Sequence, residues 1–384
     1  MENKKKLTKL AYIVTEKGCM VPETGAFNHI TSGIRELSKH FDLITLLPDK
    51  VKEINSSKLN NFSKKINWYQ KSGFWGMLRD TRDFINNWNQ SKRIKKRLKN
   101  LDCKLAYIRV QGFHPLPLIL KNCGISVFLE ANGLQFENRQ QYFHTSWLSW
   151  LYRPFERLIY KKADHVFFVG SYAKYWKLNS NNWSEVENGI EIELFPSREL
   201  PPCSKLPIKL AFLAKLTAHH QADLLEKAIN NIPQEFHKNF ELHLIGSGLD
   251  NLRNKISPGI KTINHGFVKR KDIGNLLTKM DIGLIPGGPS YNSQMKLMDY
   301  AAAGCLVIAA NIIHLNNFYK NHGISFFKSG SAISLTDTLI SILTDKKNIK
   351  KNANKLHIYV KNRFQWSQIF NNKAERILSF NRTK

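Results

Sequence analysis

The chain is 384 residues long, which is too long for one compact core and predicts two domains of similar size. Its formal net charge of +28 predicts an anionic partner (nucleic acid, acidic phospholipid or a polyanionic substrate), although an abundance of Lys and Asn would also raise the charge without any function. Five dispersed cysteines with no Cys-x-x-Cys pair exclude a disulfide framework and a zinc site, and they indicate a reducing compartment.

The first elements predict the opening of a doubly wound domain. No apolar run approaches the roughly 18 residues of a membrane span. The basic start leads directly into a strand at Leu10–Glu16, so we do not expect a signal peptide. A polar loop follows, and a helix opens at Gly25 with Ile30, Ile34 and Leu37 on one face. Gly25 then serves either a ligand-binding turn or an ordinary tight turn.

Residues 49–104 interrupt this pattern with aromatic and basic residues. The segment from Phe74 to Trp88 mixes aromatic and apolar side chains with arginines, and Ser91–Asn100 reads SKRIKKRLKN. Aromatic and basic residues on one helix are typical of a helix that lies in a membrane interface. The alternative is a solvated basic helix that docks on the domain through its aromatics. We expect this helical insert to cover about 62–100.

Four polar residues lie near the carboxyl ends of the next two predicted strands, 105–110 and 127–131, or just after them. They are Arg109, His114, Glu130 and Asn132. Ligands of open α/β sheets bind beyond the carboxyl ends of strands, so these side chains are expected to line a cleft. His114 is a candidate acid or base, or a residue that caps its loop. Glu130 needs a partner, because a charge at a buried strand end is costly on its own.

A second set of strands begins after a polar, proline-containing linker at 196–207. Strands at 208–213, 241–246, 262–268 and 282–286 alternate with helices, in the order expected of βαβ units. Later helices at 333–343 and 348–360 follow a short strand at 325–327, and a tail with a Trp-containing segment ends the chain.

The segment 281–310 is the most informative one. An apolar strand leads into a loop of Gly, Pro, Ser and Asn, a helix and a second apolar strand. Amides at a helix start favour an anion, and Ser293 and Lys296 reinforce such a site. Asp299 lies further along the helix, where its carboxylate could accept hydrogen bonds from sugar hydroxyls.

This string closely resembles the donor-binding signature of GT-B glycosyltransferases related to glycosyltransferase family 4. The matching residues are Ser293, Lys296, Leu297, Tyr300, Ala302, Ala303 and Gly304, with Asp299 where the family has Glu. The resemblance implies an α/β fold of two Rossmann-like domains that face each other across a cleft. It assigns 1–195 to an acceptor-binding domain, 196–363 to a nucleotide-sugar-binding domain and 364–384 to a helix that packs back on the first domain.

The resemblance also assigns roles to single residues. The donor-binding set is Gly25, Lys215, His220, Gly266, Tyr291, Ser293, Lys296 and Asp299. Lys215 and His220 stand where the family has Arg and Lys on the donor diphosphate, and Tyr291 stands where it has a second carboxylate that contacts the donor sugar. Arg109 and Asn132 are expected to bind the acceptor, and His114 and Glu130 to be catalytic.

The expected activity is transfer of a sugar from a nucleotide-diphosphate sugar to a lipid-linked or surface polysaccharide acceptor. The chain has no Asp-x-Asp, so we expect a metal-independent enzyme without a cofactor, and the resemblance implies that it retains the anomeric configuration. We expect it in the cytoplasm, attached peripherally to the anionic inner face of the plasma membrane, with no nucleic acid partner. The alternatives are a non-catalytic protein of the same fold that binds an anionic polymer or nucleic acid, and a sugar-nucleotide epimerase or phosphorylase.

Overall fold

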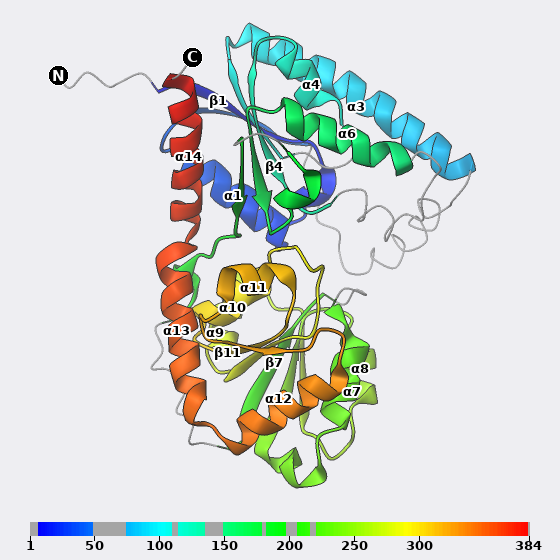
Figure 1. Ribbon diagram of the computed structural model, residues 1–384, viewed down its shortest axis with the longest axis vertical. Helices are drawn as coiled ribbons and strands as arrows, with labels where there is room; N and C mark the ends of the chain where they lie inside the picture. Colours follow the sequence, from blue (N-terminus) through cyan, green and yellow to red (C-terminus); the bar gives the residue numbers. More distant parts are fainter. Residues whose placement is uncertain are drawn as a thin grey trace, which may run out of the picture. The chain divides into compact units, whose positions relative to one another are not determined.

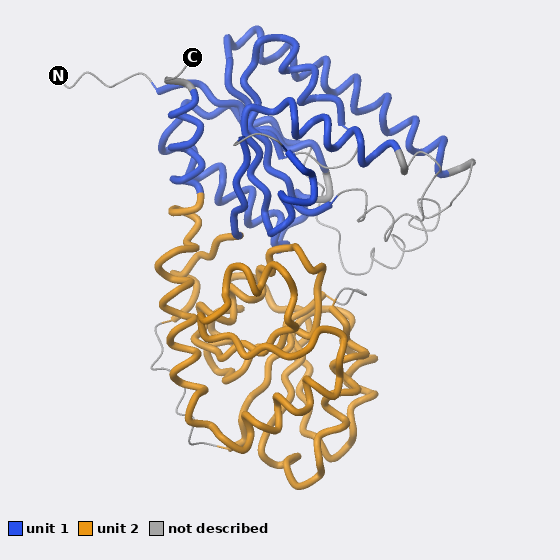
Figure 2. Tube along the Cα trace, in the orientation of Figure 1, with its two compact units in different colours: residues 1–187, 370–384 blue, residues 188–369 orange. Residues whose placement is uncertain are grey.

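The computed structural model describes residues 7–48, 74–109, 114–134, 149–178, 182–196, 206–215 and 220–382. The chain forms two compact units (Figure 2): unit 1 comprises 1–187 and 370–384, and unit 2 comprises 188–369. The first division, after residue 187, lies before the linker at 196–207 that the sequence suggests. The second, after residue 369, lies later than the expected one at 364. The reason is local: the N–H of Ile190 donates to the carbonyl of Phe364, which ties the residues after 187 to unit 2. The part of the expected insert before residue 74 lies outside the described residues.

Unit 1 is built on a six-stranded parallel sheet in the order β2-β1-β3-β4-β5-β6. The strands are β1 (Lys9–Val14), β2 (Asp42–Leu46), β3 (Leu105–Arg109), β4 (Ser126–Ala131), β5 (His165–Val169) and β6 (Trp183–Val186). The sequence predicts β1, β3 and β4, because buried parallel strands are continuous apolar runs. It misses β6, whose four residues are all half-buried and form no apolar run.

Helices cover both faces of this sheet (Figure 1). They are α1 (Gly25–Leu37), α3 (Phe74–Asn100), α4 (Leu116–Lys121) and α6 (Ser149–Lys162), with short 3-10 turns η1 (Lys17–Met20) and η2 (Ala173–Trp176). The last helix, α14 (Trp366–Arg382), starts in unit 2, and its residues from Phe370 onward belong to unit 1. There Phe380 packs edge-on against Phe128 of β4, and the ring of Phe370 packs against Gly33 of α1.

Unit 2 repeats the architecture with a second six-stranded parallel sheet in the order β12-β11-β10-β7-β8-β9. The strands are β7 (Ile208–Leu213), β8 (Phe240–Ile245), β9 (Thr262–Gly266), β10 (Ile282–Ile285), β11 (Leu306–Ala310) and β12 (Ile324–Phe327). The helices are α7 (Ala222–Asn230), α8 (Asp250–Lys255), α9 (Arg270–Leu277), α10 (Met295–Ala302), α11 (Ile313–Tyr319), α12 (Ala332–Thr344) and α13 (Lys347–Arg363), with the 3-10 turns η3 (Ile192–Leu194) and η5 (Gln234–Asn239). One continuous apolar core from Ile190 to Ile369 fills this unit.

Helix α10 is held on the sheet of unit 2 by Tyr300. The Tyr300 ring lies against Gly283 of β10, where a Cβ atom would come within 2.2 Å of it, so only glycine fits. The Tyr300 hydroxyl accepts from the N–H of Leu213 (2.6 Å) and donates to the carbonyl of Ala211 (3.1 Å), both on β7. These contacts hold the second half of α10 on β7 and β10.

The two-sheet α/β architecture that the sequence predicts is confirmed in both units. Within the described ranges, no helix is long and apolar enough to cross a membrane.

Candidate functional site

The predicted donor-binding residues, apart from Gly25, follow the carboxyl ends of strands in unit 2. Lys215 is exposed two residues after β7, and Ser293 lies in the loop after β10, the strand next to β7 in the sheet. All strands of this sheet are parallel, so these loops lie at the same edge. This edge is the general location of ligands in open α/β sheets.

Lys296 is the second residue of α10, and its amine is buried. Its Nζ has no hydrogen-bond partner among the described residues and lies 5.8 Å from the centre of the Phe212 ring. Burial lowers the pKa of Lys296 to about 7. A buried amine without a partner costs free energy unless a ligand supplies one.

Asp299 lies one turn further along α10 and is also buried. Arg270, at the start of α9, donates from Nη1 to Oδ1 of Asp299 at 2.6 Å. Burial raises the pKa of Asp299, and the attraction of Arg270 offsets part of that rise. Arg270 therefore orients the carboxylate and favours its ionised form.

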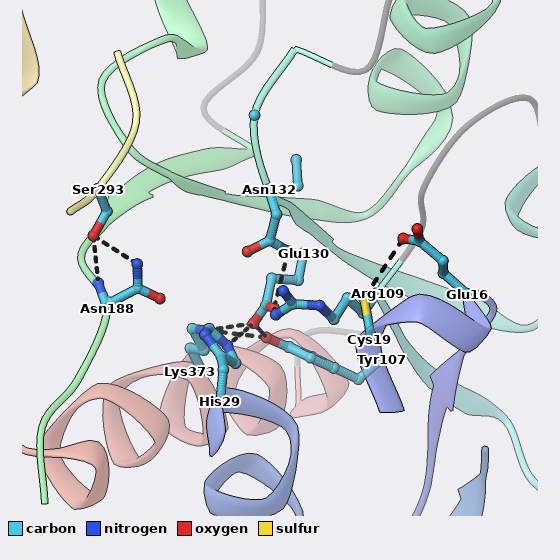
Figure 3. Close-up of polar contacts among 12 residues, drawn as sticks. Glu16, Cys19, His29, Tyr107, Arg109, Glu130, Asn132, Asn188, Ser293 and Lys373 are labelled. Carbon is cyan, nitrogen blue, oxygen red and sulfur yellow. Dashed lines mark hydrogen bonds and ion pairs between the residues drawn. The ribbon is translucent and has the colours of Figure 1, made fainter. Parts of the chain in front are cut away.

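Ser293 is fixed by Asn188, the first residue of unit 2. Its Oγ accepts from the side-chain Nδ2 of Asn188 at 2.7 Å and from the backbone N–H of Asn188 at 3.3 Å (Figure 3). The loop before α10 is thus tied to the chain segment that opens unit 2. The sequence does not predict this contact, because Asn188 precedes Ser293 by 105 residues.

The remaining predicted donor residues lie in the same unit. His220 and Tyr291 are half-buried, and Gly266 ends β9 with a φ of +63°. The carbonyl of Gly266 accepts from the N–H of Gly246 at 2.7 Å, and a Cβ at Gly266 would meet no atom within 4 Å. Two further buried oxygens near this edge, Oε1 of Gln221 and Oδ1 of Asn292, have no hydrogen-bond partner among the described residues.

In unit 1 the predicted residues Arg109, Glu130 and Asn132 come together (Figure 3). Glu130 Oε1 accepts from Arg109 Nη1 at 2.6 Å and from Asn132 Nδ2 at 3.2 Å. Its Oε2 lies 2.9 Å from Nε2 of His29 and 2.7 Å from Nζ of Lys373, and it also accepts from the Tyr107 hydroxyl. These five partners belong to α1, β3, α14 and the loop that follows β4.

Glu130 is therefore the centre of a buried polar cluster. Burial alone would raise its pKa, but His29, Lys373 and Arg109 hold the pKa of Glu130 well below its usual range. The carboxylate is fully buried and shared among the five groups. Glu130 therefore joins α14 and α1 to the sheet. This structural role is in addition to the catalytic role that the sequence suggests.

His114 takes the capping alternative that the sequence leaves open. It is buried, and its Nδ1 accepts from the N–H of Leu116 at 3.3 Å, while its Nε2 lies 3.2 Å from Oε1 of Gln90 on α3. Burial lowers the pKa of His114 to about 4, so the ring is neutral near pH 7. These contacts join α4 to α3, and the structure does not place His114 with Arg109, Glu130 and Asn132.

Gly25 is the first residue of α1 in unit 1. Thr24 caps this helix, since its Oγ1 accepts from the N–H of Phe27 at 3.2 Å. The residues that sequence reasoning misses are the partners of predicted ones: Arg270, Asn188, His29, Tyr107 and Lys373. The described residues contain no group of three or more His, Cys, Asp or Glu side chains placed to hold a metal ion.

Residues 207–345 match the family model described as "Glycosyl transferases group 1". No curated protein sequence matches the chain.

Several solved structures share the fold. HepE from Anabaena, in complex with UDP and glucose, has a TM-score of 0.67 and 13% identity, covering 97% of this chain and 100% of its own. A glycosyltransferase from Rickettsia africae has a TM-score of 0.65 and 17% identity, covering 97% and 99%. WaaG, a glycosyltransferase involved in lipopolysaccharide biosynthesis, has a TM-score of 0.62 and 12% identity, covering 96% and 99%.

Proposed function

We propose that this glycosyltransferase of the GT-B fold, which matches the group 1 family model over residues 207–345, transfers a sugar from a nucleotide-diphosphate sugar to a lipid-linked or surface polysaccharide acceptor. Two of the similar structures support the choice of substrates. The HepE structure holds UDP and glucose, and WaaG takes part in lipopolysaccharide biosynthesis.

The observation that carries this proposal is the buried amine of Lys296 at the start of α10. Free amide groups at a helix start and a buried amine without a partner form a site for an anion. The donor diphosphate occupies it, and the exposed amine of Lys215 neutralises further charge from the neighbouring strand end. When the glycosidic bond to the diphosphate breaks, these groups stabilise the negative charge that develops on the leaving group.

The nucleoside binds along the same edge of unit 2. Asp299, oriented by Arg270, accepts hydrogen bonds from the ribose hydroxyls. The open backbone at Gly266 faces the base. Ser293 positions the loop that receives the diphosphate, and His220 and Tyr291 contact the donor sugar.

Unit 1 supplies the acceptor side. Arg109 and Asn132 bind the acceptor, Glu130 holds both in place, and Gly25 opens helix α1 of the same unit. We propose transfer with retention of configuration. Neutralisation by Lys215 and Lys296 accounts for a metal-independent reaction with no cofactor.

Helix α3 supports a peripheral attachment to an anionic membrane. Its exposed apolar residues Leu78, Ile85 and Trp88 recur at spacings of three and seven, so they share one helical face. The same face continues with exposed lysines, and Nζ of Lys92 lies 5.7 Å from the centre of the Trp88 ring. Apolar anchors followed by cations are typical of an interfacial helix, which would place the enzyme on the inner face of the plasma membrane.

A thermal-unfolding panel tests the donor assignment. UDP, GDP, ADP and dTDP, and their common sugar conjugates, are each added to the protein, with the free nucleosides as controls. A diphosphate present at 100 times its dissociation constant should stabilise the protein by about 2.7 kcal/mol, while the nucleosides should not. A panel in which no diphosphate stabilises the protein, together with salt-sensitive binding to duplex DNA, would favour the non-catalytic polymer binder instead.

A further inference from the structure

The amine of Lys296 stands in an electrostatic environment that disfavours a positive charge. It lies in the first turn of α10, where the helix dipole is positive, and this turn contains no acidic residue. Nζ is buried, and its nearest described aromatic neighbour, Phe212, gives only a ring contact at 5.8 Å. No side chain of this first turn balances an ammonium ion at this position.

Three titratable groups on or beside α10 have other partners. Asp299 on the same helix binds Arg270 of α9 at 2.6 Å. The Tyr300 hydroxyl bonds to β7, and Nδ1 of His357 on α13 lies 2.9 Å from the carbonyl of Ala301. Strands β10 and β11, which also contact α10, carry no ionisable side chain, and Lys215 after β7 adds a like charge.

We propose that a nucleoside diphosphate binds unit 2 together with one proton, which Lys296 Nζ takes up from the solvent. Above pH 7 the amine is mostly neutral in the free protein, and it becomes an ammonium ion when the diphosphate oxygens provide its missing partner. This inference rests on the proposed function, because it needs the diphosphate at the start of α10. The burial that lowers the pKa of Lys296 to about 7 agrees with it.

Because Lys296 takes up a proton on binding, the affinity for the diphosphate should depend on pH in a way that a permanently charged site would not show. Above pH 7 each unit of pH removes protons from free Lys296 but not from the complex, so the affinity should fall about tenfold per pH unit. An arginine in the same place stays charged throughout this range, so its affinity should not depend on pH in this way.

Isothermal titration calorimetry tests the proposal directly. UDP, or whichever of GDP, ADP and dTDP stabilises the wild type, is titrated at pH 8 in HEPES and in Tris, two phosphate-free buffers with different enthalpies of ionisation. We expect the two binding enthalpies to differ by an amount that corresponds to nearly one proton taken up. The Lys296→Arg variant, titrated in the same way, should bind without proton uptake.

The outcomes separate this inference from the proposed function. Tight binding of the diphosphate to the wild type with equal enthalpies in both buffers would overturn the inference and leave the function standing. Proton uptake that persists in the Lys296→Arg variant would also overturn it, because another group would then be taking the proton. Absence of binding by all four diphosphates would overturn the proposed function itself. The comparison of the two buffers uses the wild type alone, so it tests proton uptake even if Lys296→Arg does not fold.

Discussion

Arg270 at the start of α9 donates a 2.6 Å hydrogen bond to the buried carboxylate of Asp299 on α10. The two residues are 29 positions apart, and their helices contact each other beside β10. Arg270 fixes the orientation of the Asp299 carboxylate and favours its ionised form. The pair therefore acts as one unit, and we expect a defect in either residue to affect the bound nucleotide.

The first prediction concerns this pair. Asp299→Asn should lower kcat/KM for the nucleotide sugar at least tenfold, about 1.4 kcal/mol, because the ribose loses an oriented carboxylate. Arg270→Met should have a similar effect, and the double variant should lose less than the sum of the two, since the residues are in contact. Asp272→Asn, an exposed carboxylate on the same helix α9, serves as the control and should leave kcat/KM unchanged. Additive losses would show that the two side chains act separately.

The second prediction concerns the buried cluster of unit 1. Glu130→Gln leaves the cations of Arg109 and Lys373 buried without their shared counter-charge, so it should cost about 3–5 kcal/mol in the free energy of unfolding. Lys373→Met leaves Glu130 with Arg109 and His29, so it should cost less, about 1–3 kcal/mol. Urea unfolding of the two variants measures this order. A larger loss in Lys373→Met than in Glu130→Gln would contradict the central position of Glu130.

These two cases show what the sequence can and cannot predict. Lys296 and Asp299 are predictable because they stand at fixed spacing on one short helix after an apolar strand. Arg270, Asn188 and Lys373 are not predictable, because each meets its partner only through the tertiary fold, and Lys373 lies 243 residues from Glu130. His114 illustrates a different limit: the local sequence allows both of its alternatives, and its contact with Gln90 of α3 arises only in the folded chain.

The fold follows the same pattern. Apolar runs such as Leu306–Ala310 predict buried strands, and the structure confirms this strand. The half-buried edge strand β6 carries no such signal. The unit boundary at 187 depends on contacts of Asn188 and Ile190 with distant residues, which a linker composition at 196–207 does not reveal.

The third prediction concerns acid stability. The pKa of His114 is lowered by burial to about 4, below the usual value of 6.5, so the folded protein resists protonation more than the unfolded chain does. Its contribution to stability is therefore full above pH 6.5 and is lost as the pH falls towards 4. His114→Asn keeps an acceptor for the N–H of Leu116 but does not titrate. Between pH 7 and 4.5 the wild type should lose about 2 kcal/mol more than this variant. Equal losses in the two proteins would mean that His114 is not the titrating group.

The fourth prediction concerns α3. Exchange of Lys92, Lys96 and Lys99 for Glu should lower binding to vesicles that contain anionic phospholipid by on the order of a hundredfold, since each lysine near such a surface contributes about 1 kcal/mol. Exchange of the exposed Lys347, Lys351 and Lys355 of α13 for Glu changes the net charge equally and serves as the control. Co-sedimentation with vesicles measures both. If the two variants lose binding equally, net charge rather than the face of α3 is responsible.

The fifth and most direct measurement concerns the amine at the start of α10, on which the account depends. The affinity for UDP, or for whichever of GDP, ADP and dTDP stabilises the protein, is determined at pH 7 for the wild type, for Lys296→Met and for Lys271→Met, whose lysine is exposed on α9. The account predicts at least tenfold weaker binding to Lys296→Met, about 1.4 kcal/mol, and unchanged binding to Lys271→Met. Binding of the diphosphate to folded Lys296→Met with wild-type affinity would contradict it.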